Sequence, residues 1–231
     1  KNLEKVIKEL KELTISLQKP VAIVVKKETF KKIEERTKFK KNKNYPFRQK
    51  IIETIIKKSP NNSVIISTTG YQLRYLKNEN TCKDFLMVGG MGHAASISAG
   101  IAKNLKNRKI ICIDGDGSLL MHTSAIQNSA MMKNFIHLVI NNGVHDSVGA
   151  QKINSKKLNY QKISEGFGYD LYYRASTLME LDTTLNKALK VNKSVFVEIL
   201  STAGTNKNLF RPKEKFLYRK NEFKKFLKKN V

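Results

Sequence analysis

The chain has 231 residues and a formal net charge of +25, with 44 basic residues against 19 acidic ones. Forty per cent of the residues are hydrophobic, which is enough for the core of one large or two small domains. No apolar run approaches the roughly 20 residues of a membrane-spanning helix, and no signal peptide is visible at the charged N-terminus. Two widely separated cysteines, Cys82 and Cys112, form no CxxC pair. We therefore expect no membrane association, a cytoplasmic location and reduced thiols, with Cys112 in the core.

The basic excess does not by itself indicate a nucleic-acid-binding protein. It consists of 37 lysines and only 7 arginines, whereas arginine is the usual reader of phosphates and bases. No stretch alternates basic residues with several aromatic ones, as a single-strand-binding surface does. We expect no specific nucleic-acid partner and only a weak attraction for anionic substrates. A basic nucleic-acid-binding module remains the alternative from another functional class.

The first 30 residues combine a helical pattern with a short apolar run. Apolar residues recur at helical spacing over residues 3–17, and Pro20 is expected to stop this helix. The β-branched run Val21–Val25 predicts a buried strand. Residues 31–46 are charged and lack apolar periodicity, which indicates a linker to a domain over residues 47–212.

Strand and helix patterns alternate through the domain over residues 47–212. The strands are expected at residues 64–67, 84–88, 110–113, 135–140, 171–173 and 195–200. The helices are expected at residues 47–57, 71–77, 94–105, 118–131 and 178–189, with a short one between 158 and 170. This alternation predicts an α/β fold, a doubly wound parallel sheet with helices on both faces. Residues 213–231 are expected to form a basic helix or tail.

Two polar motifs follow neighbouring strands of the predicted sheet. The strand expected at residues 110–113 is followed by Asp114-Gly115-Asp116-Gly117-Ser118. The strand expected at residues 135–140 is followed by Asn141-Asn142-Gly143. Asp116 and Asn142 are separated by about the length of a helix and the next parallel strand, so they can meet at one sheet edge. A carboxylate and an amide oxygen beside a helix N-terminus suit a hard cation and a phosphate-bearing ligand. Gly115 and Gly117 would let the backbone approach a diphosphate, and Ser118 could donate its hydroxyl and cap the next helix.

The Gly-Asp-Gly and Asn-Asn motifs resemble those of the thiamine-diphosphate enzymes. Four further strings make the resemblance closest to the phosphonopyruvate decarboxylase family, with sulfopyruvate decarboxylase close behind: Val88–Ser96, Leu120–His122, Lys133–His137 and Asn141–Gly149. The resemblance implies thiamine diphosphate and Mg²⁺ as cofactors and a small anionic 2-oxo acid as substrate. It implies decarboxylation of 3-phosphonopyruvate to phosphonoacetaldehyde and CO₂. Sulfopyruvate decarboxylase and an acetolactate-type carboligase remain the alternatives within this superfamily.

The same resemblance assigns roles to individual residues. The metal ligands that it implies are the carboxylate of Asp116, the amide oxygen of Asn142 and the backbone carbonyl of Val144. It places a strand-ending loop, which consists of Thr68, Thr69 and Gly70, against the diphosphate. This loop could also be an ordinary helix cap. In the second cofactor loop, Met91 would wedge under the cofactor and the Gly89 carbonyl would accept a hydrogen bond from the aminopyrimidine.

Histidines and one carboxylate complete the predicted site. His93 and His145 lie in loops that match the family, so each is a candidate for substrate contact or proton transfer, and each could instead be structural. His122 and His137 are expected to be structural. Asp146 stands where the family usually has Glu, so its reach to a reacting group is in question.

One element that the resemblance requires has no match in the sequence. The family uses a Glu from a pyrimidine-binding domain of a neighbouring subunit, and the chain contains no matching segment. The resemblance therefore implies that a pyrimidine-binding domain of the same or a neighbouring subunit is a partner, and that the enzyme is a homo-oligomer. Residues 1–30 look like the C-terminal remnant of such a domain. The chain would then be part of a longer polypeptide or one subunit of a two-gene enzyme.

Overall fold

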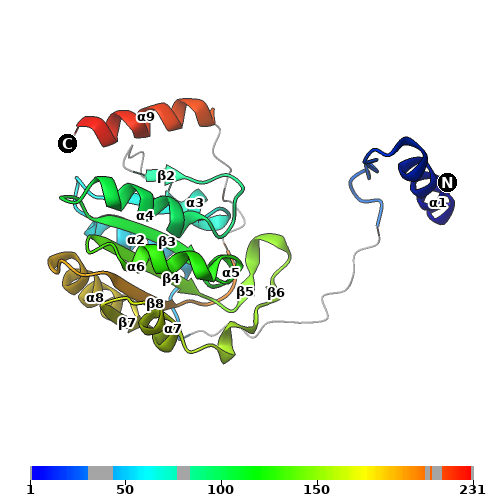
Figure 1. The fold of residues 1–231 in the computed structure, drawn as a ribbon. Coiled ribbons are helices and arrows are strands. Elements are labelled where there is room, and N and C mark those ends of the chain that lie inside the picture. The colour runs from blue at the N-terminus through cyan, green and yellow to red at the C-terminus, as the bar shows by residue number, and fades with distance from the viewer. Residues whose placement is uncertain (1, 31–43, 77–83, 206–208, 210–214, 230–231) are drawn as a thin grey trace. The chain divides into compact units, whose positions relative to one another are not determined.

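The computed structural model describes residues 2–30, 44–76, 84–205, 209 and 215–229 (Figure 1). The chain divides into two compact units, Lys1–Phe39 and Lys40–Val231. Most of the predicted linker, residues 31–43, lies outside the described residues, as does Cys82. None of the described helices has both the length and the apolarity to cross a membrane.

The first unit contains one helix, α1 (Leu3–Leu17), among its described residues. The side chain of Asn2 caps it by accepting a hydrogen bond from the N–H of Glu4 at 3.0 Å. The helix ends at Gln18, whose φ of 49° is left-handed, two residues before the proline that was expected to stop it. The prediction of a helix over residues 3–17 is confirmed.

The predicted strand over Val21–Val25 is wrong. These residues have no regular secondary structure, and Val24 is 93% exposed. A strand is stable only when a neighbouring strand pairs with it, and the described part of this unit contains no second strand. The β-branched residues alone therefore do not produce the predicted element.

The second unit is built on a six-stranded sheet in the order β2-β1-β3-β4-β8-β7, in which every pairing is parallel. The strands are β1 (Val64–Ser67), β2 (Asp84–Leu86), β3 (Ile110–Gly115), β4 (Phe135–Asn141), β7 (Leu171–Ala175) and β8 (Val195–Leu200). Every residue of β1, β3 and β8 is buried. Their continuous apolar sequences therefore match strands that are covered on both faces.

Helices cover both faces of this sheet (Figure 1). On one face pack α2 (Arg48–Lys58), α3 (Tyr71–Leu76) and α8 (Leu178–Lys190). On the other pack α4 (Ala94–Asn104), α6 (Ile126–Ala130), α7 (Tyr160–Gly166) and α9 (Phe216–Lys229). The two hydrophobic cores that result confirm the predicted doubly wound α/β fold.

The helix predicted over residues 118–131 is divided into three pieces. These are α5 (Asp116–Met121), the 3₁₀ turn η2 (Thr123–Ala125) and α6. The break lies at His122 (φ −140°, ψ 49°), where the hydroxyl of Thr123 donates to the carbonyl of Leu119 at 3.0 Å. Such side-chain bonds to the preceding turn bend helices. The sequence also gave no indication of a short hairpin of β5 (Val144–His145) and β6 (Gln151–Lys152), which follows β4.

The strand order places a crevice at one edge of the sheet. From β1 the chain moves outward to β2, then crosses back to β3 and continues in the opposite direction to β4. The order therefore reverses between β1 and β3, and the carboxyl ends of β1, β3 and β4 adjoin there. Open α/β sheets bind ligands at this kind of position.

Candidate functional site

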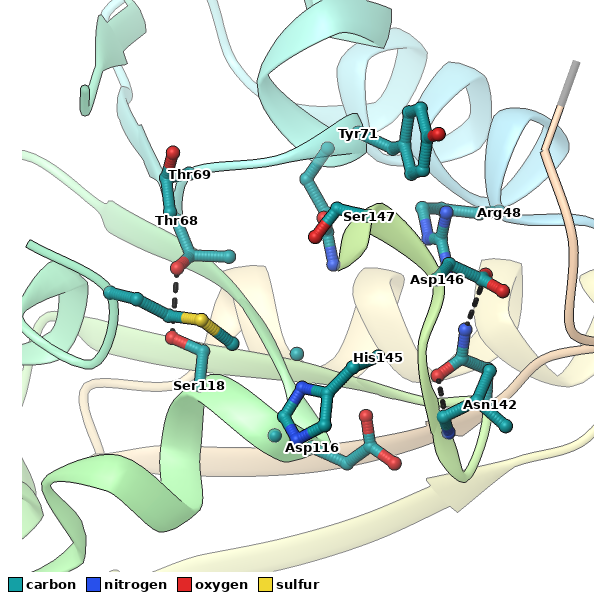
Figure 2. A pocket seen from close by; sticks show the side chains of 15 residues that line it. Arg48, Thr68, Thr69, Tyr71, Asp116, Ser118, Asn142, His145, Asp146 and Ser147 are labelled. Atoms are coloured by element: carbon teal, nitrogen blue, oxygen red, sulfur yellow. Dashed lines mark hydrogen bonds and ion pairs between the residues drawn. The ribbon is translucent and has the colours of Figure 1, made fainter. Parts of the chain in front are cut away.

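A cleft that is open to solvent lies at this edge of the sheet (Figure 2). The segments that follow β1, β3 and β4, including the starts of α3 and α5, supply most of its walls, and α2 and the β2–α4 loop complete them. Its lining residues are Arg48, Thr68, Thr69, Tyr71, Gln72, Met91, Gly115, Asp116, Gly117, Ser118, Asn142, Val144, His145, Asp146 and Ser147. Polar side chains and backbone groups from three strand ends therefore converge on one cleft.

Asp116 and Asn142 lie in this same cleft, as the motif spacing predicts. Asp116 is the first residue of α5 and is 2% exposed. Its Oδ2 accepts the backbone N–H of Gly143 at 2.8 Å and the hydroxyl of Ser155 at 3.1 Å. The loop after β4 is thereby joined directly to the loop after β3, with Asn142 and Val144 beside it.

The carboxyl group of Asp116 is costly to ionise where it lies. Burial raises its pKa to about 6, although the N–H of Gly143 and the hydroxyl of Ser155 act in the opposite direction. A cation placed next to this group would favour the ionised form. A buried carboxylate beside an amide oxygen is therefore an oxygen donor set suited to Mg²⁺.

The other wall of the cleft is held together by hydroxyl groups. Thr68 Oγ1 and Ser118 Oγ share a hydrogen bond of 2.8 Å, and Ser118 Oγ also accepts the N–H of Gly92 at 3.1 Å. The prediction that Ser118 caps a helix is wrong, because α5 begins two residues earlier at Asp116 and Gly115 occupies the cap position. Ser118 instead ties together the loops after β1, β2 and β3.

Gly117 is required by a close approach inside the cleft. A Cβ at this position would lie 2.7 Å from Nδ1 of His145 and 2.8 Å from Cδ1 of Ile153. Any other residue would therefore displace the His145 ring, which Figure 2 shows beside Asp116. The sequence predicted that this glycine admits a diphosphate, and the structure adds that it admits the imidazole.

Three predicted site residues do not line the cleft. Gly70 and Gly89 have φ angles of 103° and 70° and shape the loops beside it. His93 precedes α4, and its exposed ring lies 4.1 Å from that of His122, centroid to centroid. Thr69, Met91 and His145 do line the cleft. Their predicted roles, like that of His93, stay predictions.

Several lining residues were missed by sequence reasoning. Arg48, Tyr71 and Gln72 belong to no motif that the sequence offered, and Ser147 lies in the string Asn141–Gly149 but was given no role there. Arg48 and Tyr71 come from the starts of helices α2 and α3, and the guanidinium carbon of Arg48 lies 5.8 Å from the centre of the Tyr71 ring. In a sequence, an arginine at the start of a helix is expected to be an ordinary surface residue. The position of Arg48 in the cleft becomes visible only in the folded structure.

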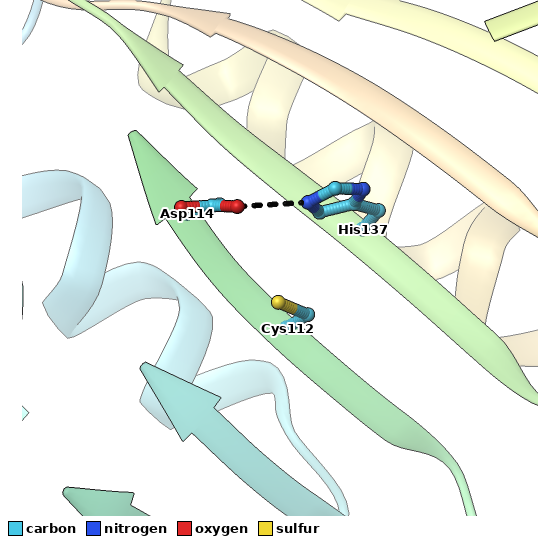
Figure 3. Close-up of side chains that lie close together, drawn as sticks. All are labelled: Cys112, Asp114 and His137. Atoms are coloured by element: carbon cyan, nitrogen blue, oxygen red, sulfur yellow. Dashed lines mark hydrogen bonds and ion pairs between the residues drawn. The ribbon is translucent and has the colours of Figure 1, made fainter. Parts of the chain in front are cut away.

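Cys112 and Asp114 on β3 and His137 on β4 form a buried polar cluster, and Asp114 lies two residues before Asp116 (Figure 3). Asp114 accepts the N–H of Gly115 at 2.9 Å through Oδ1, and its Oδ2 lies 3.4 Å from Nε2 of His137. His137 Nδ1 in turn lies 3.0 Å from the Tyr169 hydroxyl. Burial and the neighbouring Asp114 raise the pKa of the Cys112 thiol, so it remains an inert core group. The structural role predicted for His137 fits these contacts.

Comparison with known proteins identifies the family. The profile described as "Thiamine pyrophosphate enzyme, C-terminal TPP binding domain" matches residues 66–199, which is more than half of the chain. The chain belongs to the thiamine pyrophosphate enzyme family. Its cofactor, thiamine pyrophosphate, is the thiamine diphosphate of the sequence analysis, and the matched segment contains most of the residues that line the cleft.

Individual relatives of this thiamine pyrophosphate enzyme are similar over much of the chain. Phosphonopyruvate decarboxylase of Streptomyces viridochromogenes is 32% identical over 171 residues, which cover 73% of this chain and 43% of the relative. Sulfopyruvate decarboxylase subunit beta of Methanocaldococcus jannaschii is 36% identical over 155 residues, 64% of this chain and 80% of the relative. The chain therefore spans less than half of the first relative and most of the second.

The fold is also shared with solved structures of thiamine pyrophosphate enzymes. Benzoylformate decarboxylase from Polynucleobacter necessarius superposes with a TM-score of 0.58 at 17% sequence identity. The superposition covers 68% of this chain and 33% of that protein. At this level of identity the likeness concerns the fold alone.

Proposed function

We propose that this chain supplies the diphosphate-binding part of a Mg²⁺-dependent decarboxylase that converts 3-phosphonopyruvate to phosphonoacetaldehyde and CO₂. The observation that carries the proposal is the meeting of Asp116 and Asn142 in one cleft of a thiamine pyrophosphate enzyme. The similarity to phosphonopyruvate decarboxylase over 73% of the chain supports the choice of reaction.

The donor groups in the cleft fit a magnesium ion bound to a diphosphate. Asp116 offers a carboxylate, Asn142 an amide oxygen and Val144 a backbone carbonyl, and Mg²⁺ takes its remaining ligands from phosphate oxygens and water. A cation bound beside Asp116 would lower its raised pKa, because the positive charge favours the ionised carboxylate. Thr68, Thr69 and Ser118 bring hydroxyl groups to the same cleft for the phosphate oxygens.

The chain's own residues would bind, orient and transfer protons. Bound thiamine diphosphate supplies an electron sink for the electron pair released when the bond between C1 and C2 of the 2-oxo acid breaks. Met91 would hold the cofactor from the β2–α4 loop. His145 lines the cleft beside Gly117 and would donate the proton that becomes the aldehyde hydrogen on C2. His93, which lies outside the cleft lining at the start of α4, would contact the substrate.

A sulfonate substrate is the second candidate. The sulfopyruvate decarboxylase beta subunit is 36% identical, and the chain covers 80% of its length, against 43% of the phosphonopyruvate decarboxylase. Phosphonate and sulfonate groups have similar shapes, so both acids could enter one site. The two groups differ in charge, so their affinities could differ. An acetolactate-type carboligase would differ in its product, which contains a new carbon–carbon bond.

A pyrimidine-binding domain is the partner that this function needs. We propose that residues 1–30 belong to the end of such a domain and that residues 47–212 form the diphosphate-binding domain. The complete site would then form in an oligomer, whether the partner domain lies in the same polypeptide or in a second subunit. The name of the relative from Methanocaldococcus jannaschii, a beta subunit, supports the second arrangement.

The test is the reaction of the natural assembly, purified through a tag on this chain and supplied with Mg²⁺ and thiamine diphosphate. Equal concentrations of 3-phosphonopyruvate and sulfopyruvate are offered separately, and CO₂ and aldehyde are measured. We expect both products from 3-phosphonopyruvate with the higher kcat/KM. A higher kcat/KM for sulfopyruvate would favour the second candidate, and CO₂ release with a ketol product instead of an aldehyde would reject both.

A further inference from the structure

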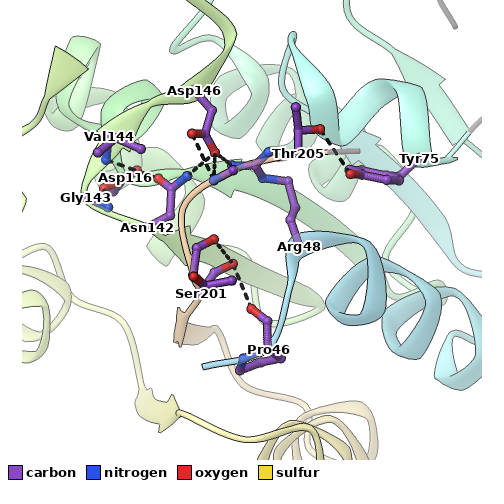
Figure 4. Close-up of polar contacts among 12 residues, drawn as sticks. Pro46, Arg48, Tyr75, Asp116, Asn142, Gly143, Val144, Asp146, Ser201 and Thr205 are labelled. Atoms are coloured by element: carbon purple, nitrogen blue, oxygen red, sulfur yellow. Dashed lines mark hydrogen bonds and ion pairs between the residues drawn. The ribbon is translucent and has the colours of Figure 1, made fainter. Parts of the chain in front are cut away.

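Asp146 lies where three segments that are distant in the sequence meet (Figure 4). One of its oxygens, Oδ2, accepts the side-chain amide of Asn142 at 2.7 Å and Nη2 of Arg48 at 2.5 Å. The backbone N–H of Gly204 lies 3.1 Å from both of its oxygens. The loop after β4, the start of α2 and the segment after β8 are therefore joined through one carboxylate.

This arrangement determines which way the amide of Asn142 faces. A carboxylate accepts hydrogen bonds and donates none, so the NH₂ group of Asn142 must point toward Asp146. The amide oxygen then points away from Asp146, and it lies 3.3 Å from the backbone nitrogen of Val144. The orientation leaves oxygen, the atom that a magnesium ion binds, on the opposite side of the amide.

Arg48 has few other partners that would explain its burial. Its side chain is 4% exposed and that of Asp146 is 7% exposed. Nε and Nη1 of Arg48 are buried without a hydrogen-bond partner in the described structure. A buried guanidinium with two unpaired nitrogens lowers stability, so a purely structural reason for it is weak. Its hydrogen bond to Asp146 places the positive charge directly against the carboxylate that orients Asn142.

The ends of the two outer segments are also fastened to each other. The carbonyl of Pro46 accepts the Ser201 hydroxyl at 3.1 Å and the N–H of Thr202 at 3.2 Å. These bonds fix the start of α2 against the segment that leaves β8, just before Arg48 and Gly204. Two of the donors to Asp146, Arg48 and Gly204, therefore come from segments that are hydrogen-bonded to each other.

We propose that Arg48 and Asp146 are positioning residues for the metal site: Arg48 holds Asp146, and Asp146 turns the amide oxygen of Asn142 toward the metal ion. This inference rests on the proposed function, because it takes Asn142 to be a ligand of Mg²⁺. It also gives a role to the carboxylate at position 146, whose oxygens bind Arg48, Asn142 and the N–H of Gly204.

The test measures Mg²⁺ affinity by calorimetry in the presence of inorganic pyrophosphate, and does not depend on turnover. Asp146→Asn replaces an acceptor by a group whose NH₂ can compete for the same space, so the Asn142 amide loses its fixed orientation. We expect Mg²⁺ binding to weaken about 10–100-fold, as for other residues that orient metal ligands. Arg48→Gln is expected to weaken it in the same direction. The double variant should bind no more weakly than the weaker single variant, because both act through one group.

Two further variants separate positioning from general structure. Asp146→Glu keeps the carboxylate and should restore most of the affinity lost in Asp146→Asn. Asp170→Asn is the matched control, since Asp170 also anchors a loop, through Lys133 and the N–H and hydroxyl of Ser194. It should lower the melting temperature and leave Mg²⁺ affinity within twofold of the wild type.

Asp116→Ala serves as the reference for the metal site itself. If it leaves Mg²⁺ affinity unchanged, the proposed function fails and the inference fails with it. If Asp116→Ala weakens binding while Asp146→Asn and Arg48→Gln remain within twofold of the wild type, the positioning role alone is wrong. If Asp146→Asn does not fold, Arg48→Gln and Asp146→Glu decide the question in the same assay.

Discussion

The buried carboxyl group of Asp116 makes the stability of the metal-free protein depend on pH. Its pKa is about 6 in the fold and 3.8 in the unfolded chain, mainly because burial disfavours the charge. Between these values the folded state binds the proton more tightly, so the contribution of this one group to stability is most favourable below pH 4 and is lost as the pH rises through about 6. At about 1.4 kcal/mol per unit of pKa difference, the cost above pH 6 is about 3 kcal/mol.

Asp116→Asn isolates this contribution, because an amide has nearly the same shape and does not titrate in this range. Urea unfolding of both proteins is measured in EDTA from pH 4 to pH 8, and the difference in unfolding free energy is plotted against pH. Other carboxyl groups titrate in both proteins, so they cancel in the difference. We expect the difference to move by about 2–2.5 kcal/mol in favour of Asp116→Asn between pH 4 and pH 7, because part of the unfolded carboxyl is already ionised at pH 4. A difference that stays constant with pH would refute the reasoning.

Three other substitutions test the packing and the hydrogen bonds. Gly117→Ala should push on the His145 ring, lower stability by about 1–3 kcal/mol and weaken cofactor binding, as measured by thermal unfolding and calorimetry. Asn134→Ala should lose about 2–3 kcal/mol in urea unfolding, because its amide donates to the carbonyls of residues 102, 105 and 108. Thr177→Ala should cost about 1 kcal/mol by removing the capping box of α8, without changing cofactor affinity.

Each of these predictions has a result that would contradict it. Gly100→Ala is the control for Gly117→Ala: no atom lies within 4 Å of its added Cβ, so this substitution in α4 should stabilise the helix by about 0.5–1 kcal/mol. Equal effects of the two glycine substitutions would disprove the crowding at Gly117. For Asn134→Ala, a loss under about 0.5 kcal/mol would mean that water replaces the amide. For Thr177→Ala, weaker cofactor binding would mean that α8 is coupled to the cleft.

The sheet and the two central motifs of the cleft were predictable because they depend on local patterns and one topological rule. Buried parallel strands are continuous apolar runs, and their carboxyl ends must share an edge. Asp116 and Asn142 follow such strands, so their meeting in one cleft needed no information beyond the order of the elements. The family resemblance then gave the cofactor.

The features that were missed depend on contacts between distant residues. Arg48 lies 98 residues before Asp146, and nothing in the sequence near either residue indicates that they pair. Helix α5 begins directly after Gly115, the last residue of β3, so a serine two residues inside the helix was mistaken for its cap. The apolar run at Val21–Val25 has the composition of a strand, but strand formation requires a pairing partner as well.

The account depends most directly on the metal ion between Asp116 and Asn142. Thiamine diphosphate affinity is measured by calorimetry with and without Mg²⁺, in the wild type, in Asp116→Ala and in Asn142→Ala. We expect Mg²⁺ to tighten binding strongly in the wild type and to have no effect in Asp116→Ala, while both variants keep the wild-type circular dichroism spectrum. A Mg²⁺-dependent affinity that is the same in Asp116→Ala as in the wild type would contradict the account.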